Sequence, residues 1–120
     1  MNAIFHQTAH ALRHKLAERH ISAAELTMLY LQRMQALGGK NGVNAVAEID
    51  ETALEQARML DNAPQKRDLP LFGLPILIKD NIDVQGLHTT AGSVALADHI
   101  ASADAPVVAR LRANGAIILG

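Results

Sequence analysis

The chain has 120 residues, 49% of them hydrophobic and 19% charged, which is enough for one compact domain with a core and argues against a disordered chain. The formal net charge of −1, without a local run of Lys or Arg, gives no field for recruiting nucleic acid or an anionic membrane. Cysteine is absent, and no signal-peptide core or apolar stretch of about 18 residues occurs, so we expect a cytoplasmic protein without disulfides or a bound cofactor.

The first part of the chain shows the periodicity of amphipathic helices. Apolar residues recur every three or four positions between residues 9 and 16, after Thr8, which predicts a short helix with a Thr8 cap. Ser22 and Glu25 form a capping box that opens a second helix. The glycine pair at positions 38 and 39 is predicted to end this helix in the left-handed conformation.

A strand and a third helix are expected next. Residues 45–49 are compatible with a short strand, and Asp50 is predicted to cap a helix that runs to about Asn62. The buried side of this helix is predicted to contain Ala53, Leu54, Ala57 and Leu60. Residues 63–70 form a polar connection with two prolines.

Two apolar runs predict a parallel pair of strands. Residues 71–78 are nearly all apolar, as in a strand covered on both faces, and 116–119 form a second such run. Between them, residues 82–102 are loop-like apart from a short apolar turn at 94–97. Asp104 is predicted to cap a helix with Val107, Val108 and Leu111 facing inward. A strand, a helix and a strand in this order predict a right-handed βαβ unit.

The domain organisation expected from these elements is one partial domain over 1–120, with a helical region at 1–62 and an α/β region at 71–120. The apolar run that closes the chain has nothing after it to cover it, which suggests a sequence cut from a longer one. Its open sheet edge is a possible surface for self-association or for a partner subunit.

Lys79 is the first candidate for chemistry. It follows the apolar run at 71–78 directly, and polar residues at the end of a buried strand often form the site of an α/β protein. Desolvation disfavours the charged form of an amine, so a lysine placed there can act as a general base. The alternative is a solvent-facing lysine. A phosphate-binding lysine would need a glycine-rich loop before it, and the sequence has none there. A lysine that forms a Schiff base remains an alternative.

Two other groups are weaker candidates. His6, His10 and His14 share one helical face, but eight residues of helix rise about 12 Å, so the outer two cannot bind one metal ion, and a solvated helix edge explains them better. Ser93 follows Lys79 at a short distance in sequence, but only one glycine flanks it, so helix capping is the expected role. His88 lies near the predicted site but reads as a loop residue.

The stretch Gly73-Leu74-Pro75-Ile76-Leu77-Ile78-Lys79-Asp80-Asn81 resembles the lysine motif of the amidase signature family. The loop at 86–93 and the segment at 104–120 are similar to further elements of that family, as are residues 21–26 and 44–50. The similarity covers approximately residues 8–120.

This resemblance implies an α/β/α sandwich around a mixed sheet and a triad of nucleophilic serine, cis-peptide serine and lysine. The motif assigns the lysine to Lys79. The segments that would contain both serines and the oxyanion donors are not among these 120 residues. The resemblance therefore implies an amide hydrolase acting on a small-molecule amide, with the chain inactive by itself. The alternatives are a non-catalytic binding or assembly module and an ammonia-releasing amidotransferase A-type subunit.

Overall fold

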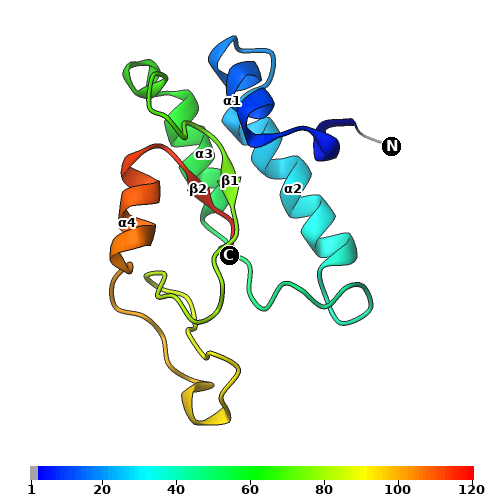
Figure 1. Cartoon of the computed structure of the whole chain (residues 1–120), viewed down its shortest axis with the longest axis vertical. Coiled ribbons are helices and arrows are strands. Elements are labelled where there is room, and N and C mark those ends of the chain that lie inside the picture. Colours follow the sequence, from blue (N-terminus) through cyan, green and yellow to red (C-terminus); the bar gives the residue numbers. More distant parts are fainter. Residues whose placement is uncertain (1–2) are drawn as a thin grey trace.

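The structure, a computed structural model, describes residues 3–120. Four α-helices, three short 3₁₀ segments and two strands follow one another in these residues (Figure 1). In chain order they are η1 (Ala3–His6), α1 (Ala9–Ala17), α2 (Ala23–Leu37), α3 (Ala53–Asp61), η2 (Pro64–Lys66), β1 (Pro75–Ile76), η3 (Val94–Leu96), α4 (Pro106–Ala113) and β2 (Ile117–Ile118). No helix among the described residues is long and apolar enough to cross a membrane.

The two strands pair in parallel, which confirms the prediction for the two apolar runs. Pro75 is in register with Ile117, and Ile76 with Ile118. Both strands are shorter than predicted, and residues 71–73, at the start of the first apolar run, form a turn. Backbone hydrogen bonds nevertheless continue beyond both ends of the strand pair. Gly73 N donates to Gly115 O (2.9 Å), and Ile78 N donates to Gly120 O (2.9 Å).

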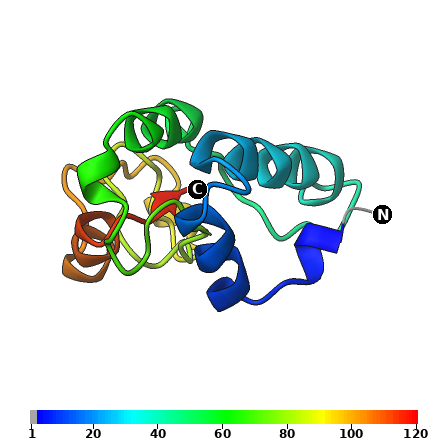
Figure 2. The same ribbon diagram turned by 90° about the horizontal axis from the view of Figure 1, so that it is seen from above.

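The small sheet separates two apolar cores. Ile117 and Leu119 belong to the core formed with α1, α2 and α3, whereas Ile118 packs with Val108 of α4 and with Val84 of the loop that follows β1. Successive side chains of a strand point to opposite faces, so one run of apolar residues in β2 serves both cores. Helices thus lie on both sides of the sheet, as Figures 1 and 2 show, and the chain has an α/β architecture.

The starts of α1 and α2 agree with the sequence. Thr8 Oγ1 accepts from Ala11 N (3.1 Å), and the Ser22–Glu25 capping box is formed in both directions. A second carboxylate, from the end of α3, completes the cap of α2. Asp61 accepts from Ala23 N (2.8 Å) and Ala24 N (2.9 Å), so donors that a helix leaves unpaired at its first turn are bound here.

The strand predicted at 45–49 is wrong. This segment has no regular secondary structure and forms no ladder with β2 in the described structure. Its neighbour Asp50 donates one backbone bond to Leu119 O (2.7 Å), and Glu48 O lies close to Gly120. The segment follows the outer edge of β2 without becoming a strand of the sheet.

Two predicted aspartate caps are also wrong. Helix α3 begins at Ala53, and the Asp50 side chain instead accepts from the backbone and hydroxyl of Thr52. Asp104 accepts from Gln85 N (2.8 Å) and from Arg112 Nε (2.8 Å), so it joins a loop to α4 instead of capping it.

Two smaller predictions in α2 and α4 need correction. Gly38 ends α2 with a right-handed φ of −81°, and a side chain there would collide with Val46 Cγ2, only 2.6 Å from the position of a Cβ atom. Close packing, not a left-handed turn, is therefore what requires glycine at this position. Val107, which is predicted to face inward, is 50% exposed.

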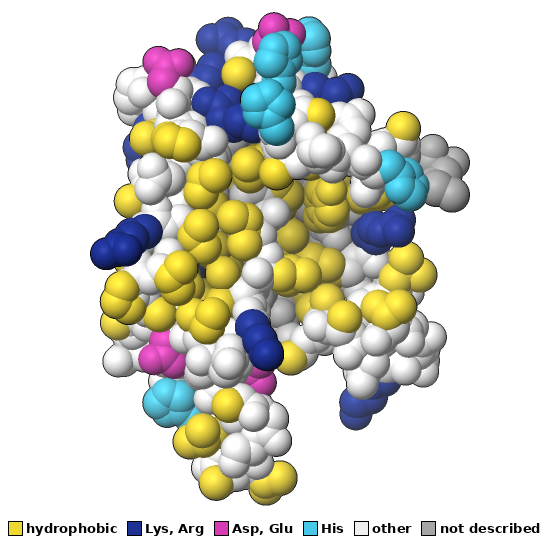
Figure 3. Space-filling model, viewed as in Figure 1, with side chains coloured by type: hydrophobic (Ala, Val, Ile, Leu, Met, Phe, Trp, Pro, Cys, Tyr) yellow, Lys and Arg dark blue, Asp and Glu magenta, His cyan; other side chains and the backbone are white. Residues whose placement is uncertain are grey.

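Residues 86–101 form a projecting hairpin. His88 and Ile100 pair as an antiparallel bridge, and Ala101 N donates to Leu87 O (3.0 Å). Residues 91–100 at its tip are all exposed. In the space-filling view, this hairpin extends below a face on which hydrophobic side chains gather, while basic and histidine side chains crowd the opposite end over α1 (Figure 3).

Replacing Asp61 with alanine is expected to destabilise the fold by about 1–3 kcal/mol, because two amides at the start of α2 lose a charged acceptor. Urea unfolding measures this change. Asp68→Ala is the matched control, since Asp68 is exposed, and it should change stability by less than about 0.5 kcal/mol. Equal effects of the two substitutions would contradict the assigned role of Asp61.

Candidate functional site

Lys79 follows the last bond of the parallel pairing. Ile78 N donates to Gly120 O, and the chain leaves the sheet at the next residue. The position at the carboxyl end of a parallel strand is the predicted one. Its side chain is exposed and makes no hydrogen bond or ion pair within residues 3–120, whereas its carbonyl accepts from Ile82 N (3.0 Å).

Lys79 lines a cleft of about 240 Å³ at the end of the sheet. The segment 45–48 forms one wall, and residues 77–80 with parts of 82–88 form the others. Apolar side chains such as Leu77 and Ile82 alternate there with four ionisable residues: Glu48, Lys79, Asp80 and His88. The cleft thus combines an apolar lining with several polar groups, as small-ligand sites usually do.

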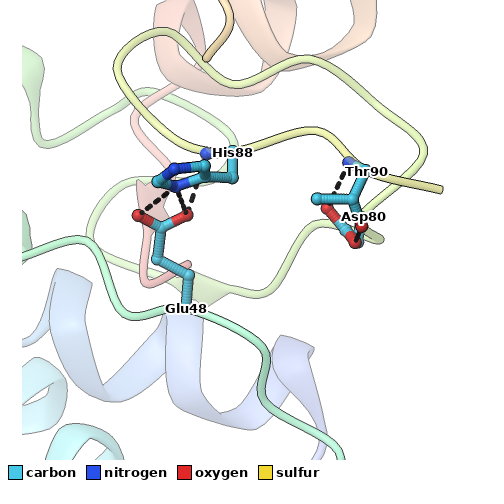
Figure 4. A network of polar contacts seen from close by, with 4 residues as sticks. All are labelled: Glu48, Asp80, His88 and Thr90. Atoms are coloured by element: carbon cyan, nitrogen blue, oxygen red, sulfur yellow. Dashed lines mark hydrogen bonds and ion pairs between the residues drawn. The ribbon is translucent and has the colours of Figure 1, made fainter. Parts of the chain in front are cut away.

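Asp80 holds the loop that follows the cleft. Its carboxylate accepts from Thr90 N (2.9 Å) and from the Thr90 hydroxyl (Figure 4). Its carbonyl accepts from Ala91 N (3.0 Å). The hydrogen bonds from the Thr90 hydroxyl and amide lower the pKa of Asp80, and the Gly92 amide and nearby His88 add to this effect. Partial burial opposes it.

The turn held by Asp80 has an unusual backbone. Ala91 has a φ of 50° and Gly92 one of 71°, and Ser93 N donates to Thr90 O (2.8 Å), as in a type I′ turn. The left-handed conformation costs a non-glycine residue about 1–2 kcal/mol. The hydrogen bonds that Thr90 and Ala91 donate to Asp80 offset this cost and hold the turn against Asp80.

Glu48 and His88 form a second polar contact in the cleft. Glu48 Oε2 accepts from His88 N (2.8 Å), and both carboxylate oxygens lie 3.1 Å from His88 Nδ1 (Figure 4). Sequence reasoning did not single out Glu48 and read His88 as a loop residue. The partners are 40 positions apart, so no local pattern could have indicated the contact.

The other predicted candidates lie outside this cleft. His14, in the last turn of α1, pairs with Glu18 (3.4 Å), and His10, in the first turn, is exposed. Within residues 3–120, no group of three or more His, Asp or Glu residues is arranged to hold a metal ion. Ser93 precedes η3, but its side chain makes no capping bond, so the predicted capping role is wrong.

The fold and the cleft define a layered α/β protein with a lysine at the carboxyl end of a parallel strand pair. A model of the Amidase family matches residues 25–120, and the chain belongs to this family. Over 112 residues it is 40% identical to the A-type subunit of the glutamyl-tRNA(Gln) amidotransferase of Thermus thermophilus, covering 93% of this chain and 22% of that protein.

Solved structures show the same likeness. The peptide amidase of Stenotrophomonas maltophilia matches 91% of the chain with a TM-score of 0.82 and 38% identity, and the chain covers 23% of that protein. An amidase family protein of Bacillus anthracis matches 95% with a TM-score of 0.86 and 35% identity, again over 23% of its own length. The chain therefore spans less than a quarter of these relatives.

The Asp80 contact predicts a pH dependence. The pKa of Asp80 is lowered in the folded chain, so the stabilisation is complete above the ordinary aspartate range of about pH 4 and is lost as the pH falls through the lower folded value. The amide signal of Thr90, followed by NMR, should titrate with a midpoint below about pH 4. Thr90→Val removes the hydroxyl donor and should raise this midpoint. A midpoint in the ordinary range with no response to Thr90→Val would contradict the contact.

Proposed function

We propose that Lys79 is the proton-accepting base of an amide hydrolase whose nucleophilic serine and relay serine lie outside these 120 residues. The observation that carries this proposal is the place of Lys79 in a family-matched segment, at the carboxyl end of β1 and in an open cleft. The exposure of Lys79 supports the need for a further part of the protein, because a neutral amine requires a cover that excludes water.

The proposed reaction is an acyl transfer. A neutral Lys79 amine accepts the nucleophile's proton through the relay serine, and the nucleophile attacks the amide carbon. Backbone donors stabilise the oxyanion, the amide nitrogen takes up a proton and leaves, and water releases the acyl group. The turn at 90–93, held by Asp80, borders the reacting groups in this scheme. A small-molecule amide substrate and a cytoplasmic location belong to the same proposal.

A second candidate is an ammonia-releasing subunit that works with a partner. It is favoured by the identity to the Thermus thermophilus protein, whose name describes one subunit of an amidotransferase. Exposed apolar side chains are consistent with a covering partner or a further part of the same protein, since Met59 is 64% exposed and Leu77 49%. The third candidate is a non-catalytic assembly module, which would bind a partner through the same exposed apolar side chains and catalyse no reaction.

The 120-residue chain alone is expected to hydrolyse no simple amide above background, because removing the nucleophile of such a triad abolishes most of the acceleration. Ammonia release from a panel of primary amides measures this, with Lys79→Ala as the control. The two chains should be indistinguishable. Turnover that depends on Lys79 would overturn the proposal that the serines lie elsewhere and would make Ser93 the first suspect.

The role of Lys79 can be tested in a chimera in which this chain replaces the matching segment of the Stenotrophomonas maltophilia peptide amidase. Lys79→Ala in an active chimera is expected to lower kcat by at least about 100-fold, as for loss of a general base. Lys40→Ala, which changes an exposed lysine outside the cleft, should leave kcat unchanged. Retained turnover in the Lys79→Ala chimera would rule Lys79 out as the base.

A further inference from the structure

The contact between Glu48 and His88 determines how the imidazole can bind other groups. A carboxylate oxygen accepts hydrogen bonds, and both Glu48 oxygens lie 3.1 Å from His88 Nδ1. Nδ1 therefore carries the hydrogen, and in a neutral imidazole this leaves Nε2 with a free electron pair. The backbone bond from His88 N to the same carboxylate (2.8 Å) limits rotation of the pair.

Both partners are held by the fold as well as by each other. Glu48 lies in the segment that borders β2, two residues before the bond from Asp50 N to Leu119 O. His88 lies in one arm of the hairpin, where it pairs with Ile100, and Thr89 N donates to His99 O (3.0 Å). The side chains are nevertheless partly open to solvent, with 43% of His88 and 35% of Glu48 exposed. A ligand in the cleft can reach them.

The cleft therefore offers two kinds of polar group to a ligand. Lys79 has an amine that donates in either protonation state and has no partner within residues 3–120. His88 offers an acceptor at Nε2, while the carboxylates of Glu48 and Asp80 are already bound to His88 and Thr90. Leu77, Ile82 and Leu87 give the same cleft an apolar lining. A complementary ligand has an apolar body and an N–H donor for His88, while the Lys79 amine stays available as the base of the proposed reaction.

We propose that His88 is a specificity-determining residue whose Nε2 accepts the N–H of the substrate amide, and that Glu48 is the positioning residue that keeps Nε2 free to accept. An amide with an N–H supplies this donor, and its carbonyl oxygen stays free for the backbone donors of the proposed reaction. An ester or a fully alkylated amide lacks the donor and leaves His88 unpaired. That the ligand is a substrate rests on the proposed hydrolase function, whereas the binding preference does not.

The tautomer is tested first, by ¹⁵N NMR of the imidazoles in the 120-residue chain, recorded at a pH above the last observed change of their signals. His88 should be in the Nδ1–H form, and Glu48→Ala should shift it toward the Nε2–H form. The signals of His99, in the other arm of the hairpin and outside the cleft, should not change with Glu48→Ala. An Nε2–H tautomer of His88 in the unmodified chain would overturn the proposal.

Ligand preference is tested by titrating the same chain with isobutyramide, N,N-dimethylisobutyramide and methyl isobutyrate. Isobutyramide should shift the His88 Nε2 signal and bind about two- to tenfold more tightly than the two ligands without N–H, as expected for one hydrogen bond. His88→Phe should abolish this preference, whereas His99→Phe should keep it. Equal binding of the three ligands by the unmodified chain, a result that needs no variant, would overturn the proposal.

The two proposals fail in different experiments. If Lys79→Ala leaves the chimera active while the chain still prefers isobutyramide, the assignment of Lys79 as the base is wrong and the role of His88 stands. If Lys79→Ala abolishes turnover while the three ligands bind equally, the hydrolase proposal stands and the role of His88 is wrong.

Discussion

The parallel pairing between residues 71–78 and 114–120 is the constraint on which the rest of this structure depends. Its backbone bonds extend from Leu71 N, which donates to Asn114 O, to Ile78 N, which donates to Gly120 O. Because the strands are parallel, the chain must cross over between them, and α4 and the hairpin lie in that crossover. The pairing also brings Lys79 to the edge where both strands end, next to the cleft.

Helices are attached to this pairing largely through Phe72, which is fully buried. The guanidinium groups of Arg13 and Arg67 lie over its ring, 5.9 Å and 5.0 Å from the centroid. Their donors reach backbone carbonyls, since Arg13 Nε donates to Leu69 O (3.1 Å) and Arg67 Nη1 to Leu16 O (3.0 Å). Cation–π contacts contribute about 0.5–2 kcal/mol each, and here they join α1 to the turn that precedes β1.

In the segments without regular secondary structure, and at the start of α2, carboxylate side chains accept hydrogen bonds from backbone N–H groups. Asp61 binds the first amides of α2, Asp80 binds Thr90 N, and Glu48 binds His88 N. Charge-assisted bonds to backbone N–H groups are stronger than neutral ones, so single side chains can order segments that have few backbone bonds of their own. Two of these three contacts border the cleft, which explains how a loop-rich region acquires a defined geometry beside Lys79.

Local patterns in the sequence were sufficient for the helices α1 and α2, for the parallel relation of the two apolar runs and for the place of Lys79 after the first of them. Each depends on residues within a few positions of one another or on simple apolar content. The roles of Glu48, Asp104 and Asp61 were decided only by the tertiary structure. Their backbone partners lie 40, 19 and 38 residues away, and Asp104 in particular has the local features of a helix cap. A carboxylate accepts from whichever N–H donors the folded chain brings close to it. The spacing of residues in the sequence does not indicate which distant donors these are.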